Sequence, residues 1–395
     1  MVMTKQFSIL IQNVLFVLLG FIVFSSFDTT LCLDILHFPQ LFPELLIIPF
    51  CFLLKKKFKT LRIDVHLFLR LLYVLVFLLI LAIVIGKFEI IGILSIFRSF
   101  LYMIFFVCIF KNPNHIDTDD IQWLTLGSLL GWFYDSHINF TRLIVDFNME
   151  NITYGLLLAF PLFFSIVYVK KKYCLAIVGL GLSLGIFIYA GIRRIIAVFL
   201  ISIIVLFVIE LIGQFKKIFS IILISGILIV TYYLFSVQIE SYVMEASPQL
   251  HYRMYVRTEQ TMGGNSGDAD KKRMNNLSEF EKQGELLFIP RGLYTNHTSE
   301  KGAGIFNDMP LAALTWVLGL PITVLLLFSL IIKTKKAFNN YIKSGNTDIV
   351  PYVVSMIVMF TMLFLDGSFL SYVYCAPITG MCIGKILFYS KYSNK

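Results

Sequence analysis

Five arginines are the residues of this chain with the clearest potential for chemistry. Arg193 and Arg194 stand side by side between two apolar runs, and Arg253 and Arg257 have the spacing that shares one face of an α-helix. Arg291 follows in the same polar stretch as the second pair. A guanidinium group keeps its charge at every physiological pH and pairs bidentately with phosphate oxygens. The pattern predicts a binding site for phosphate or diphosphate groups.

Simpler explanations for two of these pairs remain open. Arg193 and Arg194 could extend to lipid head groups, as long basic side chains do near a membrane surface. Arg253 and Arg257 could form the solvated face of a short loop helix. Either alternative would leave the arginines without a ligand.

Two residues are candidates for a general base. Asp308 lies at the start of a long apolar run, where its carboxylate could be partly desolvated, and it is our first choice. His297 is the second choice, because imidazole titrates near neutral pH. Asn307 and Asp308 are also good helix N-caps, a role that is compatible with catalysis.

Aromatic residues near these groups are candidates for stacking on sugar rings: Tyr252, Tyr255, Tyr294 and Trp316. Aromatic residues also gather at membrane interfaces for structural reasons, so this role stays open. The six cysteines show no metal-ligand spacing. We therefore expect neither a metal nor a cofactor.

The composition places these residues in a membrane protein rather than in a soluble enzyme. Of the 395 residues, 58% are hydrophobic and 14% are charged, whereas soluble domains carry about 25% charged residues. The mean hydropathy is +0.83. The net charge of +9 does not indicate a nucleic-acid partner, because Lys and Arg occur in short clusters between apolar runs.

Apolar runs predict the path of the chain, since a spanning helix needs about 20 apolar residues. The expected spans are 7–27, 35–54, 67–86, 89–110, 121–140, 152–169, 173–190, 192–212, 218–237, 307–332, 349–366 and 368–388. Charges inside or beside these runs, such as Arg98 and Asp366, have no assigned role. We expect an all-α polytopic membrane protein with about twelve transmembrane helices, forming one unit over residues 1–395.

The distribution of basic residues predicts the orientation. Connections on the side of both termini carry nineteen Lys and Arg residues, and the opposite short connections carry four. Such a bias places both termini in the cytoplasm. The long polar segment 238–306, inserted between the ninth and tenth spans, is then external, with short surface helices expected over 248–259 and 278–288.

This arrangement resembles the bacterial O-antigen polymerase and O-antigen ligase superfamily. The shared features are the turn Gly191-Ile192-Arg193-Arg194 before an apolar run, an arginine early in one long external loop, and a polar pair that opens the next span. They cover roughly residues 150–330. The pair here is Asn307-Asp308, where the ligase pattern has His-Asn, and this difference favours a polymerase.

The resemblance implies a GT-C-like fold and a metal-independent, inverting glycosyltransferase in the bacterial inner (cytoplasmic) membrane. Its substrate would be an oligosaccharide linked to undecaprenyl diphosphate. The partners we expect are this lipid-linked glycan, the bilayer and, as a further candidate, a chain-length regulator protein, with no nucleic acid. Two alternatives stay open: a ligase that transfers the glycan to lipid A core, and a flippase for lipid-linked oligosaccharides.

Overall fold

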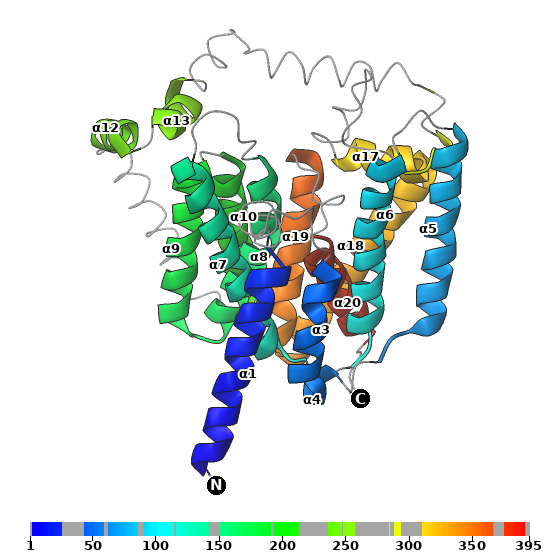
Figure 1. Ribbon diagram of the computed structural model, residues 1–395, viewed down its shortest axis with the longest axis horizontal. Helices are drawn as coiled ribbons and strands as arrows, with labels where there is room; N and C mark the ends of the chain where they lie inside the picture. The colour runs from blue at the N-terminus through cyan, green and yellow to red at the C-terminus, as the bar shows by residue number, and fades with distance from the viewer. Residues whose placement is uncertain are drawn as a thin grey trace.

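Long apolar helices make up most of the chain that the computed structural model describes (Figure 1). The described residues are 2–25, 43–58, 62–85, 90–113, 116–142, 150–190, 193–213, 236–246, 248–256, 284, 288–293, 310–365 and 375–391. Over these ranges the fold is all-helical, without a strand. The expected all-α class is therefore confirmed.

The helices follow one another along the chain with mostly short connections. They are α1 (Val2–Val23), α3 (Pro43–Leu53), α4 (Lys55–Phe58), α5 (Val65–Ile85), α6 (Ile90–Phe110), α7 (Thr118–Arg142), α8 (Glu150–Val169), α9 (Tyr173–Ala190), α10 (Arg193–Gly213), α12 (Ser236–Ala246), α13 (Pro248–His251), α17 (Pro310–Leu318), α18 (Leu320–Ser344), α19 (Val350–Leu365) and α20 (Ala376–Tyr389). A π-helical turn, Tyr252–Val256, follows α13, and a 3-10 turn, Thr347–Ile349, precedes α19.

Length and composition identify two candidate membrane spans among the described residues, one within α1 and one formed by α5. A third arises if the bent pair α17 and α18 is counted as one span. Six further stretches, in α6, α8, α9, α10, α19 and α20, are apolar but shorter. The twelve-span count therefore stays a prediction.

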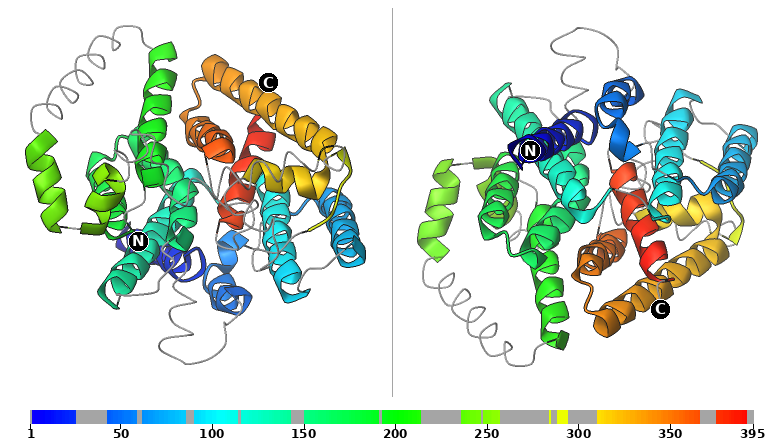
Figure 2. Two further views of the ribbon diagram at one scale, coloured as in Figure 1. Left: turned by 90° about the horizontal axis from the view of Figure 1, so that it is seen from above. Right: turned by 90° about the horizontal axis from the view of Figure 1, so that it is seen from below.

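The centre of the bundle is formed by helices that are buried on several sides. In α8, every residue from Leu158 to Val167 is buried, and α19 is buried over most of its length. The outer helix α5 instead buries Leu75, Leu78 and Ala82 and exposes apolar side chains on the rest of its surface. α18 runs obliquely along the outside of α19 and α20 (Figure 2).

Glycines allow α1 and α7 to approach closely along the bundle. A Cβ atom at Gly20 would overlap the Leu124 carbonyl, and one at Gly127 would overlap the Val17 carbonyl. Because both obstacles are backbone atoms, a side chain there could be accommodated only by separating the helices. The small residues therefore set the distance between α1 and α7.

Replacing Gly127 with alanine should destabilise the protein by about 1–3 kcal/mol, the usual cost of overpacking a close contact. Gly181→Ala is the matched control, because a Cβ there meets nothing within 4 Å. That control should be neutral or stabilise by up to about 1 kcal/mol, since alanine is the better helix former. Equal thermal unfolding midpoints of the two variants in detergent would contradict the predicted contact.

Ion pairs join the helices at one end of the bundle, which we call the lysine-rich end. Lys57 Nζ lies 2.6 Å from Asp120 Oδ2, and Lys111 Nζ lies 2.7 Å from Asp64 Oδ2. Hydrogen bonding from Lys111 lowers the pKa of the Asp64 carboxyl below its ordinary value. The first residue of α1 and the last turn of α20 lie at this same end (Figure 1).

The acidic run Asp117-Thr118-Asp119-Asp120, which opens α7, belongs to this end and caps the helix. Asp117 accepts a hydrogen bond from the Asp120 backbone N–H at 2.9 Å, and Asp120 accepts one from the Asp117 N–H at 3.1 Å. Asp119 pairs with Lys170 and Lys172 at 2.9 and 2.8 Å. The two reciprocal hydrogen bonds form a capping box. The ion pairs of Asp119 join α7 to the connection between α8 and α9.

The predicted tenth span, 307–332, is not one continuous helix. α17 and α18 meet at Gly319 with a bend of 118°. Gly319 has a φ of +77°, a conformation that glycine adopts without strain, and Pro321 stands in the first turn of α18. The Thr323 hydroxyl donates to the Leu314 carbonyl at 3.0 Å across the bend. The break therefore turns α17 flat over the end opposite to the lysines (Figure 1).

Candidate functional site at the Arg291 end

A short segment, Phe288–Leu293, is held against the bend between α17 and α18. The Arg291 N–H donates to the Trp316 carbonyl at 3.0 Å, and the Leu293 N–H donates to the Leu78 carbonyl at 3.2 Å. Leu293 is fully buried in a core cluster with residues of α5, α6 and α17. The segment is thus fixed both by backbone hydrogen bonds and by an apolar anchor.

Two glycines make this close docking possible. Gly292 has a φ of +86°, and a Cβ there would overlap the backbone of α5 at Leu78 and Ala82. A Cβ at Gly319 would come within 2.8 Å of the Phe288 carbonyl oxygen. Both positions combine a left-handed backbone with a close approach, so only glycine fits without displacing the segment.

The docked segment holds a cation at the end of the bundle that carries α17. The guanidinium carbon of Arg291 lies 4.8 Å from the centre of the Trp316 ring. Arg291 is half-buried, so its charge is held in place on the indole but remains partly open to solvent. A guanidinium stacked in this way still has N–H groups directed outward in its plane that can bind an anion. We call this part of the molecule the Arg291 end.

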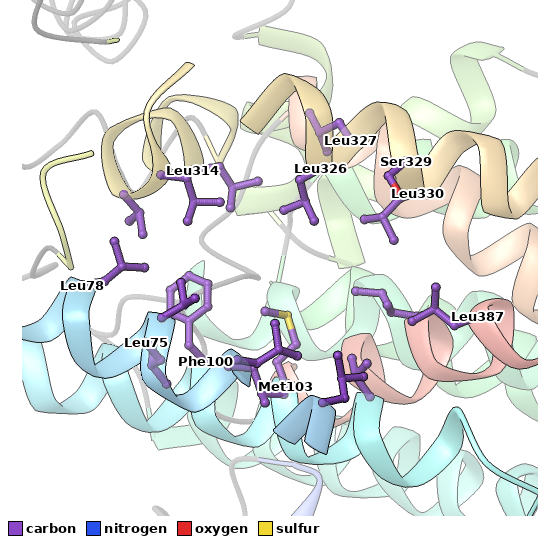
Figure 3. Close-up of a pocket in the computed structure, with 18 of the residues that line it drawn as sticks. Leu75, Leu78, Phe100, Met103, Leu314, Leu326, Leu327, Ser329, Leu330 and Leu387 are labelled. Carbon is purple, nitrogen blue, oxygen red and sulfur yellow. The ribbon is translucent and has the colours of Figure 1, made fainter. Parts of the chain in front are cut away.

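An apolar groove begins at the docked segment and runs along the bundle towards the lysine-rich end (Figure 3). Its volume is about 340 Å³, and its lining is apolar apart from Ser329. Figure 3 shows Leu326, Leu327 and Leu330 on one wall, facing Phe100 and Met103 on the other. Leu293 and Val317 also line the groove. Leu293 is two residues from Arg291, and Val317 is next to Trp316 in the sequence.

The groove is long because it follows α5 for about three turns. Leu67 and Leu78, both on its wall, are eleven residues apart on α5, which corresponds to about 16 Å along a helix axis. Apolar clefts of this size hold small molecules or parts of larger ones. A chain-like apolar ligand with an anionic group at one end fits this combination of groove and cation.

The sequence-predicted site residues are described to different extents. Asp308, His297, Tyr294 and Arg257 lie outside the described residues. Arg193 and Arg194 are the first residues of α10. The preceding helix, α9, begins at the lysine-rich end and ends at the opposite end, so the two arginines lie at the Arg291 end (Figure 1). Arg253 lies in the π-helical turn, which replaces the α-helix expected there.

Two predicted sugar-stacking residues lie away from Arg291. α12, α13 and the π-helical turn, in the first part of the segment predicted to be external, lie over the side of the bundle that contains α9 rather than over α17 (Figures 1 and 2). There Tyr255 stacks on the His251 ring at 5.4 Å, and His251 Nε2 lies 3.1 Å from Glu240 Oε1. Tyr252 is exposed. Within the described residues, the structure brings together Arg291 and Trp316 but not these tyrosines.

Trp316 makes a contact that the sequence did not predict. One face of its ring carries Arg291. We therefore assign Trp316 the positioning of Arg291. Stacking of Trp316 on a sugar ring stays a prediction.

Several relevant residues were missed. The groove has no sequence signature, because its leucines resemble any lipid-facing or core leucine. Gly292 and Gly319 follow recognisable turn signals, Pro290-Arg291-Gly292 and Gly319-Leu320-Pro321, which could have indicated a break. Asp135 is buried in α7, and an acidic residue inside an apolar run was also a visible signal.

Arg98, the basic residue within the predicted fourth span, has a local partner. Its Nε donates to the Tyr102 hydroxyl at 3.2 Å, and its guanidinium lies 5.6 Å from the centre of that ring. Asp366 lies outside the described residues. Within the described residues, no group of three or more His, Cys, Asp or Glu side chains is arranged to hold a metal ion.

No family model matches this chain, and no curated protein shows significant similarity to it.

Proposed function

We propose that this protein is a bacterial surface polysaccharide polymerase, for O-antigen or capsule, that joins repeat units carried on undecaprenyl diphosphate. The observation that carries the proposal is the Arg291 guanidinium, fixed on Trp316, while the nearby residues Leu293 and Val317 line a long apolar groove. An isoprenoid diphosphate has the same two parts in the same order, an apolar chain followed by an anionic group. The groove would hold the chain and Arg291 would hold the diphosphate.

The reaction proposed is glycosyl transfer with inversion. The acceptor hydroxyl attacks the anomeric carbon of the donor glycan, its proton passes to a base, and the bond from that carbon to the diphosphate oxygen breaks. Undecaprenyl diphosphate leaves with the bonding electrons. A diphosphate leaving group needs neutralisation of charge rather than protonation, and arginine supplies it. Asp308 is the proposed base, with His297 as the second candidate.

Membrane location is part of the same proposal. Two helices of sufficient length and hydropathy, and apolar side chains on the outer surfaces of α1, α5 and α18, support it. The ion-paired lysines lie at the end of the bundle that positive-inside counting assigns to the cytoplasm. The Arg291 end would then face outward, with a multi-pass, GT-C-like arrangement of about twelve spans and cytoplasmic termini. Labelling of single cysteines within 238–306 by an impermeant reagent should succeed in intact cells.

Purified full-length protein, incubated with one kind of lipid-linked repeat unit, should produce a ladder of longer glycans and release undecaprenyl diphosphate. Product that forms only when lipid A core is added would identify a ligase instead. Translocation of the lipid-linked unit across vesicles without a new glycosidic bond would identify a flippase. Either of these results would contradict polymerisation.

A further inference from the structure

A second groove lies between α10, α18 and α19. Its volume is about 380 Å³. α10 contributes Val208 and Ile209, α18 contributes Ile331 and Phe338, and α19 contributes Val353 and Ile357. Since α10 and α18 both pack on α19, the groove is the space between two outer helices above a shared floor.

The surface of this groove is suited to an apolar chain. Its lining includes two polar residues, Thr334 and Lys335. The Thr334 hydroxyl donates to the Leu330 carbonyl at 2.8 Å, so it is satisfied within α18. Val208 and Ile331 leave about half of their surface exposed, at 48% and 49%, which makes the groove accessible from the side. Covering such surface with a hydrocarbon chain is favourable.

Charge indicates what the chain is attached to. Lys335 lies on the groove wall and is exposed, as is Lys336, the next residue; Lys333, two residues before Lys335, is half-exposed. Across the groove, Glu210 follows Ile209, but its carboxylate accepts a hydrogen bond from the Tyr168 hydroxyl of α8 at 2.9 Å. The wall formed by α18 therefore presents one cation, Lys335, to the groove, and an anionic head group would lie against it.

We propose that this groove binds one acyl chain of an anionic glycerophospholipid, with its phosphate at Lys335. The site is distinct from the first groove: α18 and α19 border both grooves, but no residue lines both. It lies towards the lysine-rich end, where the leaflet opposite to the proposed reaction would be. Binding there would tie α10 to α18 across α19, and saccharide transfer does not require it.

Native mass spectrometry of the full-length protein, with phosphatidylglycerol and phosphatidylcholine of identical chains as probes, tests the site. Phosphatidylglycerol should bind more tightly than phosphatidylcholine. Lys335→Gln should weaken phosphatidylglycerol binding by about 5-fold, the effect of losing one lysine near an anionic surface. Lys343→Gln, on the same helix but away from the groove, is the matched control and should leave binding unchanged.

Filling the groove tests the chain rather than the head group. Val208→Trp should weaken binding of phosphatidylglycerol by about 10-fold, as expected when a ligand no longer fits its pocket. Leu200→Trp, at an exposed position of α10 outside the groove, should have no effect. Equal binding of the two lipids, or equal loss in both tryptophan variants, would overturn the proposal. So would a dimer that Val208→Trp dissociates, because the occupant would then be a second copy.

Discussion

Replacing Arg291 with alanine should lower the rate of repeat-unit transfer by about 100-fold or more while leaving the protein folded. Loss of a fixed group that stabilises developing charge typically costs this much. The side chain is half-buried on the surface of Trp316, so its removal takes away about 1 kcal/mol of cation–π contact and leaves the backbone anchors in place. The measurement is the initial rate of glycan lengthening by purified protein.

Conservative variants separate charge from position. Arg291→Lys keeps the charge but loses the planar, bidentate geometry, and it should show an intermediate loss. Trp316→Leu should lower the rate only a few-fold, because the cation remains but its position is no longer fixed. Arg62→Ala, exposed near the lysine-rich end, is the control and should retain full activity. An Arg291→Ala protein as active as this control would remove the basis of the proposed site.

An assay in cells extends the test to arginines whose side chains are not described. Cells carrying Arg193→Ala or Arg253→Ala should display single repeat units without long chains, if these residues hold the diphosphates of the two carriers as the sequence predicts. Unchanged chain-length ladders in both variants would show that neither Arg193 nor Arg253 is needed, and would leave Arg291 as the candidate for binding the diphosphate. The result would also establish whether α10 and the π-helical turn belong to the site.

Sequence patterns determined the helices better than they determined the site. Predicted runs such as 67–86 and 152–169 correspond closely to α5 and α8, because an uninterrupted apolar stretch has few alternatives to a helix. The prediction of a single helix over 307–332 was wrong. The bend depends on the positive φ of Gly319 and on its close approach to Phe288, which is distant in sequence. A hydropathy profile contains no information on either feature.

The candidate site illustrates the same limit. Arg291 and Trp316 could both be selected by residue type, since a cation and an aromatic near a span are unusual enough to notice. Their contact could not be predicted, because it depends on Gly292 packing against α5 more than two hundred residues earlier in the chain. The groove is a property of three-dimensional packing alone. Only the relative placement of α5, α6 and α18 makes ordinary leucines into a binding surface.

Filling the first groove should impair transfer from long carriers and spare short ones. Leu326, exposed by 41%, lines the groove on α18, and Leu326→Trp would place an indole where the isoprenoid chain is proposed to lie. We expect the catalytic efficiency, kcat/KM, with an undecaprenyl carrier to fall about 10-fold, mainly through a higher KM. We expect a carrier of two isoprene units to end before Leu326, and the variant and the unmodified protein should then use it equally well.

Leu325→Trp is the matched control for this experiment. Leu325 is the neighbouring residue on α18, is 68% exposed and does not line the groove, so the same substitution adds the same bulk outside it. Its kcat/KM should equal that of the unmodified protein with both carriers. Because chain length and position vary independently, a loss common to both tryptophan variants would indicate a general perturbation of α18. A loss confined to Leu326→Trp and to the long carrier would indicate that the groove binds the isoprenoid chain. If no such loss occurs, the groove does not bind the chain, whatever the result for the diphosphate site at Arg291.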